Sequence, residues 1–206
     1  MKFRDFLKKL LESKFYIFSF QDLLLLFPEE KPEALKKLLY RWRKKGWIYS
    51  LKRGLFALVY PRELSIPDLF IANKLYEPSY VSLETALSHY SIIPEVSMAV
   101  ISVTTKPTRE FKNKYGLFLY HTVKPACFVG YYIEKVEEFE VLIAEPEKAL
   151  VDFLYFRIYR VRNSNLKDFR LDAERISLLN MKKVERYWCI YGLDPEVLYA
   201  YLRGID

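Results

Sequence analysis

The segment between Pro32 and Gly46 constrains the fold of this chain more than any other. Proline favours the first position of a helix and glycine the position just after its end, so these two residues predict a helix between them. Four apolar side chains inside the segment recur at i, i+3, i+4 and i+7, the spacing of one helix face: Leu35, Leu38, Leu39 and Trp42. We therefore expect this face to pack against other elements of a folded domain.

The opposite face of the same predicted helix is basic and contains a tyrosine. At 3.6 residues per turn, the side chains on this face are Glu33, Lys37, Tyr40, Arg41 and Lys44, with Lys36 and Arg43 on its flanks. A helix that lies in the major groove of DNA needs such a face, because cations neutralise phosphates and long donors reach base edges. A solvated helix that binds nothing has this pattern more often, so the helix alone leaves both hypotheses open.

Two strand-like runs, residues 47–51 and 55–59, follow this helix. Lys52, Arg53 and Gly54 join them, and Gly54 suits the positive φ of a tight hairpin turn. Upstream, apolar spacing predicts helices over about residues 2–13 and 20–27, with a strand-like stretch at 15–18 between them. Ser19 and Asp22 indicate the N-cap of the second helix. Three helices followed by a hairpin is the order of a winged helix-turn-helix, with the basic hairpin tip as the wing.

We therefore expect residues 1–60 to form a winged helix-turn-helix domain that binds double-stranded DNA. In such a domain the third helix meets base edges, and the wing touches the backbone or the adjacent minor groove. The side chains expected to contact DNA are Lys36, Lys37, Tyr40, Arg41, Arg43, Lys44, Lys52 and Arg53. Some winged helices bind RNA or protein instead, and that alternative stays open.

The charge distribution supports a polyanionic partner. Residues 1–60 contain 14 Lys and Arg against 6 Asp and Glu, a net charge of +8. Residues 61–206 contain 19 Lys and Arg against 20 Asp and Glu, a net charge of −1. All the excess positive charge therefore lies in the first third of the chain, which is typical of nucleic-acid binding. Lysines that only keep an apolar domain in solution are the competing explanation.

Composition excludes several other classes of protein. The chain has 2 cysteines, Cys127 and Cys189, too few for a disulfide scaffold or a Cys-rich zinc site, and consistent with a reducing cytoplasm. Its most apolar segment, residues 149–156, contains Asp152 and is far shorter than the roughly 20 residues of a membrane span. We expect a cytoplasmic protein without membrane association.

Residues 61–206 are expected to form a second domain of the α+β class, after a seam between Pro61 and Pro67. Runs rich in β-branched and aromatic residues predict strands at 98–104, 116–123, 127–134 and 139–143. Helices are expected at 68–75, 83–90, 147–160, 172–179, 181–191 and 195–202, with Ser82, Asn180 and Asp194 as N-caps. Together these elements predict a mostly antiparallel sheet of about four strands surrounded by helices.

The sequence contains no recognisable catalytic or cofactor-binding motif. His89 and His121 are its only histidines, and a lone histidine near an aromatic segment is more often structural than a metal ligand. With only 6 glycines, a glycine-rich phosphate loop is not expected either. We therefore expect no enzyme activity, metal or cofactor. A site made of both histidines and Cys127 stays open, as does a nucleic-acid-processing enzyme that uses the carboxylates Glu84, Glu147 and Asp152.

Several segments of the second domain occur in a specific order. They are YVSLETALSHY at 80–90, IPE at 93–95, VTTK at 103–106, the strand at 116–121 and IAEPEKALVD at 143–152. With the hairpin region at 46–56, they resemble the AbiEi family of type IV antitoxins and related predicted transcriptional regulators. The resemblance spans about residues 3–160. Ser91 departs from it, because the family often has glycine after this helix.

This resemblance implies an N-terminal domain that represses its own operon at an inverted-repeat operator. It also implies a C-terminal domain that counteracts a nucleotidyltransferase-like toxin without forming a stable complex with it. A regulator without any toxin partner, and a protein-interaction module that does not bind DNA, remain alternatives. Whether the protein acts as a monomer or a dimer is left open, because no heptad pattern or evident dimer helix is present.

Overall fold

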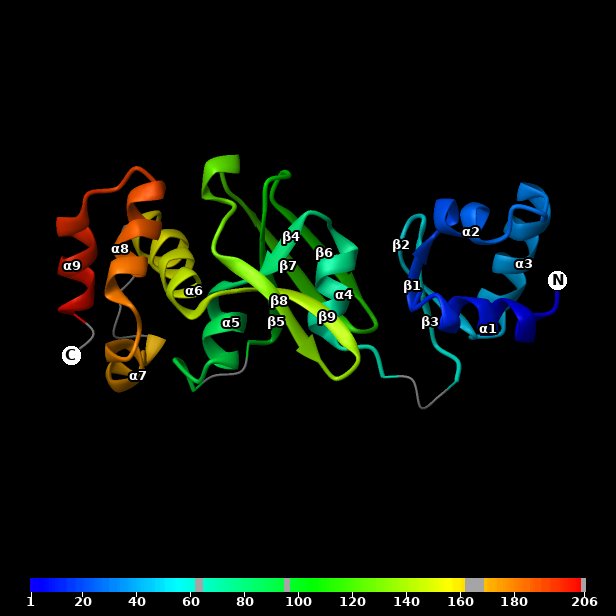
Figure 1. Cartoon of the computed structure of the whole chain (residues 1–206), viewed down its shortest axis with the longest axis horizontal. Helices are drawn as coiled ribbons and strands as arrows, with labels where there is room; N and C mark the ends of the chain where they lie inside the picture. The colour runs from blue at the N-terminus through cyan, green and yellow to red at the C-terminus, as the bar shows by residue number, and fades with distance from the viewer. Residues whose placement is uncertain (62–64, 95–96, 162–168, 205–206) are drawn as a thin grey trace. The chain divides into compact units, whose positions relative to one another are not determined.

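The computed structural model describes residues 1–61, 65–94, 97–161 and 169–204. The chain divides into two compact units, Met1–Pro67 (unit 1) and Asp68–Asp206 (unit 2), so the seam expected between Pro61 and Pro67 belongs to unit 1 and ends where unit 2 begins (Figure 1). Both units combine helices with strands, as an α+β fold requires. Unit 1 contains a small antiparallel sheet and unit 2 a larger mixed sheet.

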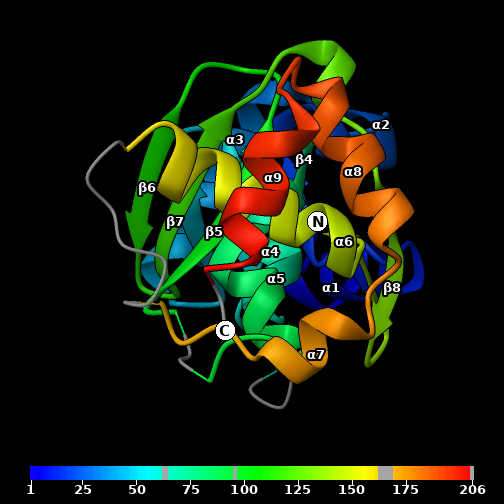
Figure 2. The same cartoon turned by 90° about the vertical axis from the view of Figure 1, so that its left-hand side faces the viewer.

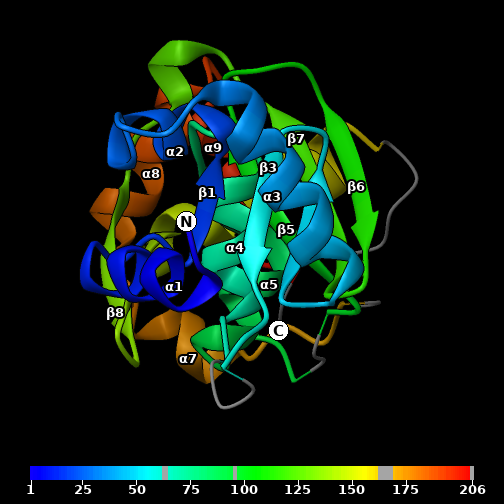
Figure 3. The same ribbon diagram turned by 90° about the vertical axis from the view of Figure 1, so that its right-hand side faces the viewer.

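The described part of unit 1 contains three helices and three short strands. In chain order they are α1 (Phe3–Glu12), β1 (Ile17–Ser19), α2 (Phe20–Leu26), α3 (Pro32–Lys44), β2 (Ile48–Lys52) and β3 (Leu55–Leu58). The sheet order is β1-β3-β2, and both pairings are antiparallel. Figure 3 shows the three helices of unit 1 together with β1 and β3.

Local capping explains where the helices of unit 1 begin and end. Ser19 and Asp22 form a capping box at α2: the Ser19 hydroxyl accepts from the Asp22 amide at 3.2 Å, and the Asp22 carboxylate accepts from the Ser19 amide at 2.6 Å. Pro32 is the first residue of α3, and Gly46 follows its end with a φ of +72°. The predicted caps of α2 and α3 are therefore confirmed.

The core of unit 1 fixes the orientation of α3. The four residues of its apolar stripe are buried, and the Trp42 ring lies 4.4 Å from the Phe6 ring of α1, centroid to centroid. Phe18 of β1 is fully buried in the same core. Because burying one such side chain stabilises a fold by about 1.5–3 kcal/mol, the stripe holds the opposite, cationic face of α3 toward solvent.

The first part of unit 2 contains the six strands of its sheet together with two helices and a 3-10 turn. They are α4 (Asp68–Leu75), β4 (Ser79–Val81), α5 (Leu83–His89), β5 (Ala99–Thr104), β6 (Arg109–Asn113), β7 (Gly116–Thr122), the 3-10 turn η1 (Pro125–Cys127), β8 (Tyr131–Val136) and β9 (Phe139–Ala144). The remaining elements are α6 (Pro146–Phe153), the π-helical segment η2 (Leu154–Tyr159), α7 (Ala173–Ser177), α8 (Met181–Ile190) and α9 (Pro195–Leu202).

The sheet of unit 2 corrects the expected mostly antiparallel sheet of about four strands. Its order is β6-β7-β5-β4-β9-β8; β5 runs parallel to β7 and β4 parallel to β9, while the other three pairings are antiparallel. The additional strands are β4 and β6. β4 has only three residues, all buried, and β6 carries mostly exposed polar side chains, so neither shows the alternation that predicts a strand.

Helices cover both faces of this sheet. Consecutive residues of β7 point to opposite faces. The Tyr120 hydroxyl donates to the Ala72 carbonyl of α4 at 2.6 Å, whereas the next ring, His121, lies against Phe156 of η2. α4 therefore covers one face, and α6 with η2 covers the other. α8 packs on α6, and α9 on α8 (Figure 2).

Three details of unit 2 differ from expectation. The Ser82 hydroxyl does not cap α5 but donates to Asp152 at 2.8 Å. Cys127 lies in η1, so the strand expected from residue 127 begins at Tyr131. The long helix expected at 147–160 turns π-helical after Phe153.

Two other expected caps of unit 2 are confirmed, because Asn180 and Asp194 cap α8 and α9 with their side chains. Among the described residues, no helix combines the length and apolarity needed to cross a membrane.

Candidate nucleic-acid interface

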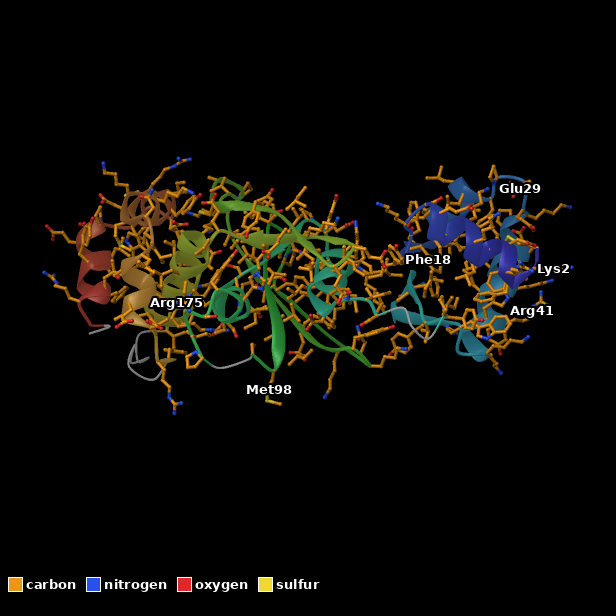
Figure 4. The ribbon with its side chains drawn as sticks, turned by 60° about the horizontal axis from the view of Figure 1, so that its bottom comes forward. Lys2, Phe18, Glu29, Arg41, Met98 and Arg175 are labelled. Carbon is orange, nitrogen blue, oxygen red and sulfur yellow. The ribbon has the colours of Figure 1, made fainter. Side chains whose placement is uncertain are left out.

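The outward face of α3 is an exposed cationic surface. All six candidate residues of this helix are exposed, including Tyr40 with 52% of its surface accessible: Lys36, Lys37, Tyr40, Arg41, Arg43 and Lys44. Figure 4 shows Arg41 at the surface of unit 1, whereas Phe18 lies among core side chains. Within the described ranges, no ion pair joins the cations of α3 to a carboxylate. Their charge therefore remains available to an anionic ligand.

The hairpin between β2 and β3 supplies the other candidate residues. Arg53 and Gly54 form its turn, between the paired residues Lys52 and Leu55. Gly54 has a φ of +81°, a conformation that a residue with a side chain rarely adopts. Arg53 is exposed and Lys52 is half-buried. The hairpin therefore presents a tight tip with an exposed guanidinium.

A furrow of about 240 Å³ lies between α3 and the hairpin tip. Three of the candidate residues on α3 line it, namely Lys36, Tyr40 and Arg43, and Gly54 lines it from the tip. Its other lining residues are Phe20 of α2, Leu39 of α3 and Phe56 of β3. The fold thus brings part of the predicted set together along this furrow. Lys37, Arg41 and Lys44 occupy the same helix but do not line the furrow.

Aromatic rings lie beside three cations of α3, of which Lys36 and Arg43 line the furrow. The Lys44 ammonium lies 5.2 Å from the centroid of the Tyr40 ring, and the Arg43 guanidinium lies 6.0 Å from it. The Lys36 ammonium lies 5.5 Å from the centroid of the Phe20 ring. Cations within about 6 Å of an aromatic face are attracted by its quadrupole. Positive charge is therefore concentrated around an aromatic surface.

No protein-family model and no curated protein matches this chain. The candidate interface therefore stands on its own geometry and charge.

Sequence reasoning missed part of this interface. Phe20 and Phe56 line the furrow although they belong to α2 and β3, and no local pattern distinguishes them from core aromatics. The start of α1 packs on the other, buried side of α3, where the Phe3 ring lies 5.3 Å from Trp42 and 4.2 Å from Trp47.

Unit 2 contains a buried polar cluster centred on Asp152. Asp152 forms an ion pair with Lys148 one helical turn earlier, and both side chains are almost fully inaccessible. The Asp152 carboxylate also accepts from the hydroxyls of Tyr80 at 3.0 Å, Ser82 at 2.8 Å and Tyr191 at 2.5 Å. Burial, reinforced by the negative charge of Asp152, raises the pKa of Tyr80 and of Tyr191 far above the ordinary tyrosine value. The cluster thus links β4 and the start of α5 to α6 and α8.

The other carboxylates considered for catalysis have partners within unit 2. Glu84 of α5 forms a two-pronged ion pair with the Arg157 guanidinium of η2. Glu147 accepts from the Asn180 amide at 3.1 Å and so ties the start of α6 to the start of α8. The structure does not bring Glu84, Glu147 and Asp152 together around one ligand, because each is bound to different residues of unit 2.

The two histidines and Cys127 also have separate surroundings. His89 bonds Glu134 through Nε2 at 3.0 Å. The His121 ring lies 4.8 Å from the Phe156 ring, and burial together with the charge of Arg157 lowers the pKa of His121. The Cys127 thiol donates to the Ile190 carbonyl at 3.5 Å, and burial raises its pKa. Among the residues described, no group of three or more His, Cys, Asp or Glu is placed to hold a metal ion.

Proposed function

We propose that this protein is a transcriptional regulator that binds double-stranded DNA through unit 1, folded as a winged helix-turn-helix. The observation that carries the proposal is the furrow, which joins the cationic face of α3 to the hairpin tip. The order of the elements supports it: α2 and α3 are the two helices of the helix-turn-helix, and β2 and β3 form the wing.

The core of unit 1 holds α3 in a fixed orientation. Its buried stripe anchors one side of the helix, so its cations project together from a rigid element. A rigid helix suits base recognition, because hydrogen bonds to base edges require fixed positions and cations on its flanks can neutralise phosphates. The tip carries Arg53, which suits contacts to the backbone or the adjacent minor groove.

A binding titration tests this proposal. The full-length protein is expected to bind duplexes selected from a random DNA library with submicromolar affinity that falls as salt increases. Replacing Arg41 or Lys37 by alanine should cost about 1–3 kcal/mol of binding free energy if that residue contacts a base. Replacing Lys52 and Arg53 by alanine should weaken binding to all sequences and reduce the salt dependence.

The four substitutions combined should abolish specific binding. Lys8→Ala, at an exposed lysine of α1, is the matched control and should bind like the wild type. Wild-type affinity in the fourfold variant would reject the proposal. Binding without salt dependence, or no binding of DNA at low salt, would favour a protein-interaction module instead.

We further propose, from the resemblance to AbiEi antitoxins, that the protein represses its own operon and counteracts a nucleotidyltransferase-like toxin without a stable complex. The test is to express the gene next to this one, with and without the protein, and to measure growth. Growth arrest that the protein relieves, although the two proteins do not co-purify, would support the antitoxin role. A neighbour that does not arrest growth would leave a regulator without this toxin partner.

A further inference from the structure

The furrow lies between two surfaces that the proposed function assigns to different grooves of one duplex. α3 is assigned to the major groove, and the hairpin tip to the backbone or the adjacent minor groove. Neighbouring grooves of a duplex are separated by a sugar–phosphate backbone. One strand of that backbone must therefore pass between α3 and the tip, where the furrow lies.

We propose that the furrow binds the sugar–phosphate backbone of one DNA strand and that its apolar floor selects deoxyribose over ribose. The inference rests on the proposed function and adds to it the chemistry of the ligand at one defined place. It assigns Lys36 and Arg43 to phosphates and leaves Lys37 and Arg41, outside the furrow, for bases.

The chemistry of the furrow matches an alternating sugar–phosphate chain. We call its exposed lining side chains the rim: these are Tyr40 and two cations, Lys36 and Arg43, which complement phosphate charge. We call its less exposed lining side chains the floor: these are Phe20, Leu39 and Phe56, whose apolar surface suits the C–H groups of deoxyribose. The space beside Gly54 is open, since a Cβ placed there would have no described atom within 4 Å. A backbone can therefore approach the tip closely.

The same floor disfavours a ribose. The side chains of Phe20, Leu39 and Phe56 contain no hydrogen-bonding atom, so a 2′-hydroxyl pressed against them loses its water without gaining a partner. The Tyr40 hydroxyl belongs to the exposed rim and not to this floor. The 2′-hydroxyl is the group by which proteins distinguish RNA from DNA. Leaving one such hydroxyl unpaired should weaken binding by about 5- to 100-fold.

A ribonucleotide scan tests the sugar preference. The full-length protein is titrated against one DNA duplex, about 24 base pairs long (roughly two helical turns), selected from a random library. Single ribonucleotides are then placed at each position of each strand. We expect the 5- to 100-fold loss at one or two neighbouring nucleotides of one strand per bound unit 1. A 2′-fluoro nucleotide at these positions, which shares the sugar pucker of ribose but lacks the hydroxyl, should bind nearly as well as DNA.

A coupling experiment tests the phosphate assignment. The phosphate beside the sensitive sugar is replaced by an uncharged methylphosphonate, and the loss of affinity is measured for the wild type and for variants. In Lys36→Ala and in Arg43→Ala, the loss of affinity caused by the substitution and the loss caused by the methylphosphonate should be less than additive. The reason is that the partner of that phosphate is already missing in these variants. In Lys37→Ala, the matched control on the same helix but outside the furrow, they should be additive.

The outcomes separate this inference from the proposed function. If the protein binds the selected duplex but no position is sensitive to ribose, the furrow does not hold the backbone and the inference fails while the proposed function stands. Additive losses in Arg43→Ala and Lys36→Ala would overturn it in the same way. If the protein binds no duplex at all, the proposed function fails and the inference fails with it.

Discussion

At the scale of single residues, the Asp152 carboxylate is a buried charged group with several partners. It is fully buried, and its partners come from residues 80, 82, 148 and 191, so one side chain links four parts of unit 2. A buried ion pair is not by itself a large source of stability, because its desolvation offsets the attraction. Removing one partner is costly, since the other charge is then left buried and alone.

We therefore predict that Asp152→Asn lowers the free energy of unfolding by about 3–5 kcal/mol, because the Lys148 ammonium stays buried without its counter-charge. Urea unfolding followed by circular dichroism measures the change. The double variant Lys148→Met with Asp152→Asn removes both charges but keeps a side-chain oxygen that can accept from the Tyr80, Ser82 and Tyr191 hydroxyls, so it should be closer to the wild type. An Asp152→Asn variant as stable as the wild type would show that the pair does not hold unit 2 together.

At the scale of elements, α3 has both a structural and a proposed functional role. Its four apolar residues are in the core of unit 1, and its cations are on the surface that we propose for DNA. α2 precedes it and starts at the capping box of Ser19 and Asp22. The N-terminus of α2 is therefore a place where the stability of the proposed helix-turn-helix can be changed without altering its cations.

Ser19→Ala should reduce the stability of α2 by about 1 kcal/mol, because the Asp22 amide loses its acceptor at the start of the helix. Hydrogen exchange at the amides of α2 measures this locally, as faster exchange than in the wild type. Ser13→Ala, at an exposed serine that ends α1, is the control and should leave exchange in α2 unchanged. Equal exchange in Ser19→Ala and the wild type would contradict the role of the capping box.

At the scale of the whole molecule, charge is divided between the two parts of the chain. The net charge of +8 over residues 1–60 contrasts with −1 over residues 61–206. The electrostatic part of DNA binding should therefore come from unit 1. Unit 2 has exposed lysines as well, among them Lys112 and Lys135, but they are balanced by carboxylates of the same region.

We predict that the salt dependence of DNA binding follows this division. Lys36→Ala with Arg43→Ala should reduce the slope of log Kd against log salt by about 0.9 for each phosphate contact that is lost. Lys112→Ala with Lys135→Ala removes the same charge from unit 2 and should leave the slope at the wild-type value. Titrations at four or more salt concentrations measure both slopes. A slope reduced equally by the two pairs would show that unit 2 contributes to the contact.

Much of unit 1 and of its candidate surface could be predicted from local patterns. The spacing of Leu35 to Trp42, together with Pro32 and Gly46, defines α3 and its exposed face, because both depend on residues within a few turns of each other. The caps at Ser19, Asn180 and Asp194 are local for the same reason. In unit 2, the helix over Asp68–Leu75 was predicted at its observed limits.

Contacts between residues far apart in the sequence determine the features that these local patterns could not predict. β5 pairs in parallel with β7, and β4 pairs in parallel with β9. Which strands become neighbours depends on how the chain crosses over between them, and the alternation of apolar and polar side chains within one strand does not encode this. Ser82 is a good capping residue by type, yet its hydroxyl turns to Asp152, which is 70 residues away. The furrow likewise depends on where the hairpin folds back onto α3, which places Lys36 and Arg43 beside it rather than Lys37 and Arg41.

The sequence by itself determined which side of each element is apolar, where most helices start and stop, and where the positive charge lies. Those properties depend on neighbours along the chain. Only the tertiary structure decided the strand order, the partners of the buried Asp152 and the residues that line the furrow. Those depend on contacts between residues far apart in sequence, which form when apolar surfaces from separate elements are buried together.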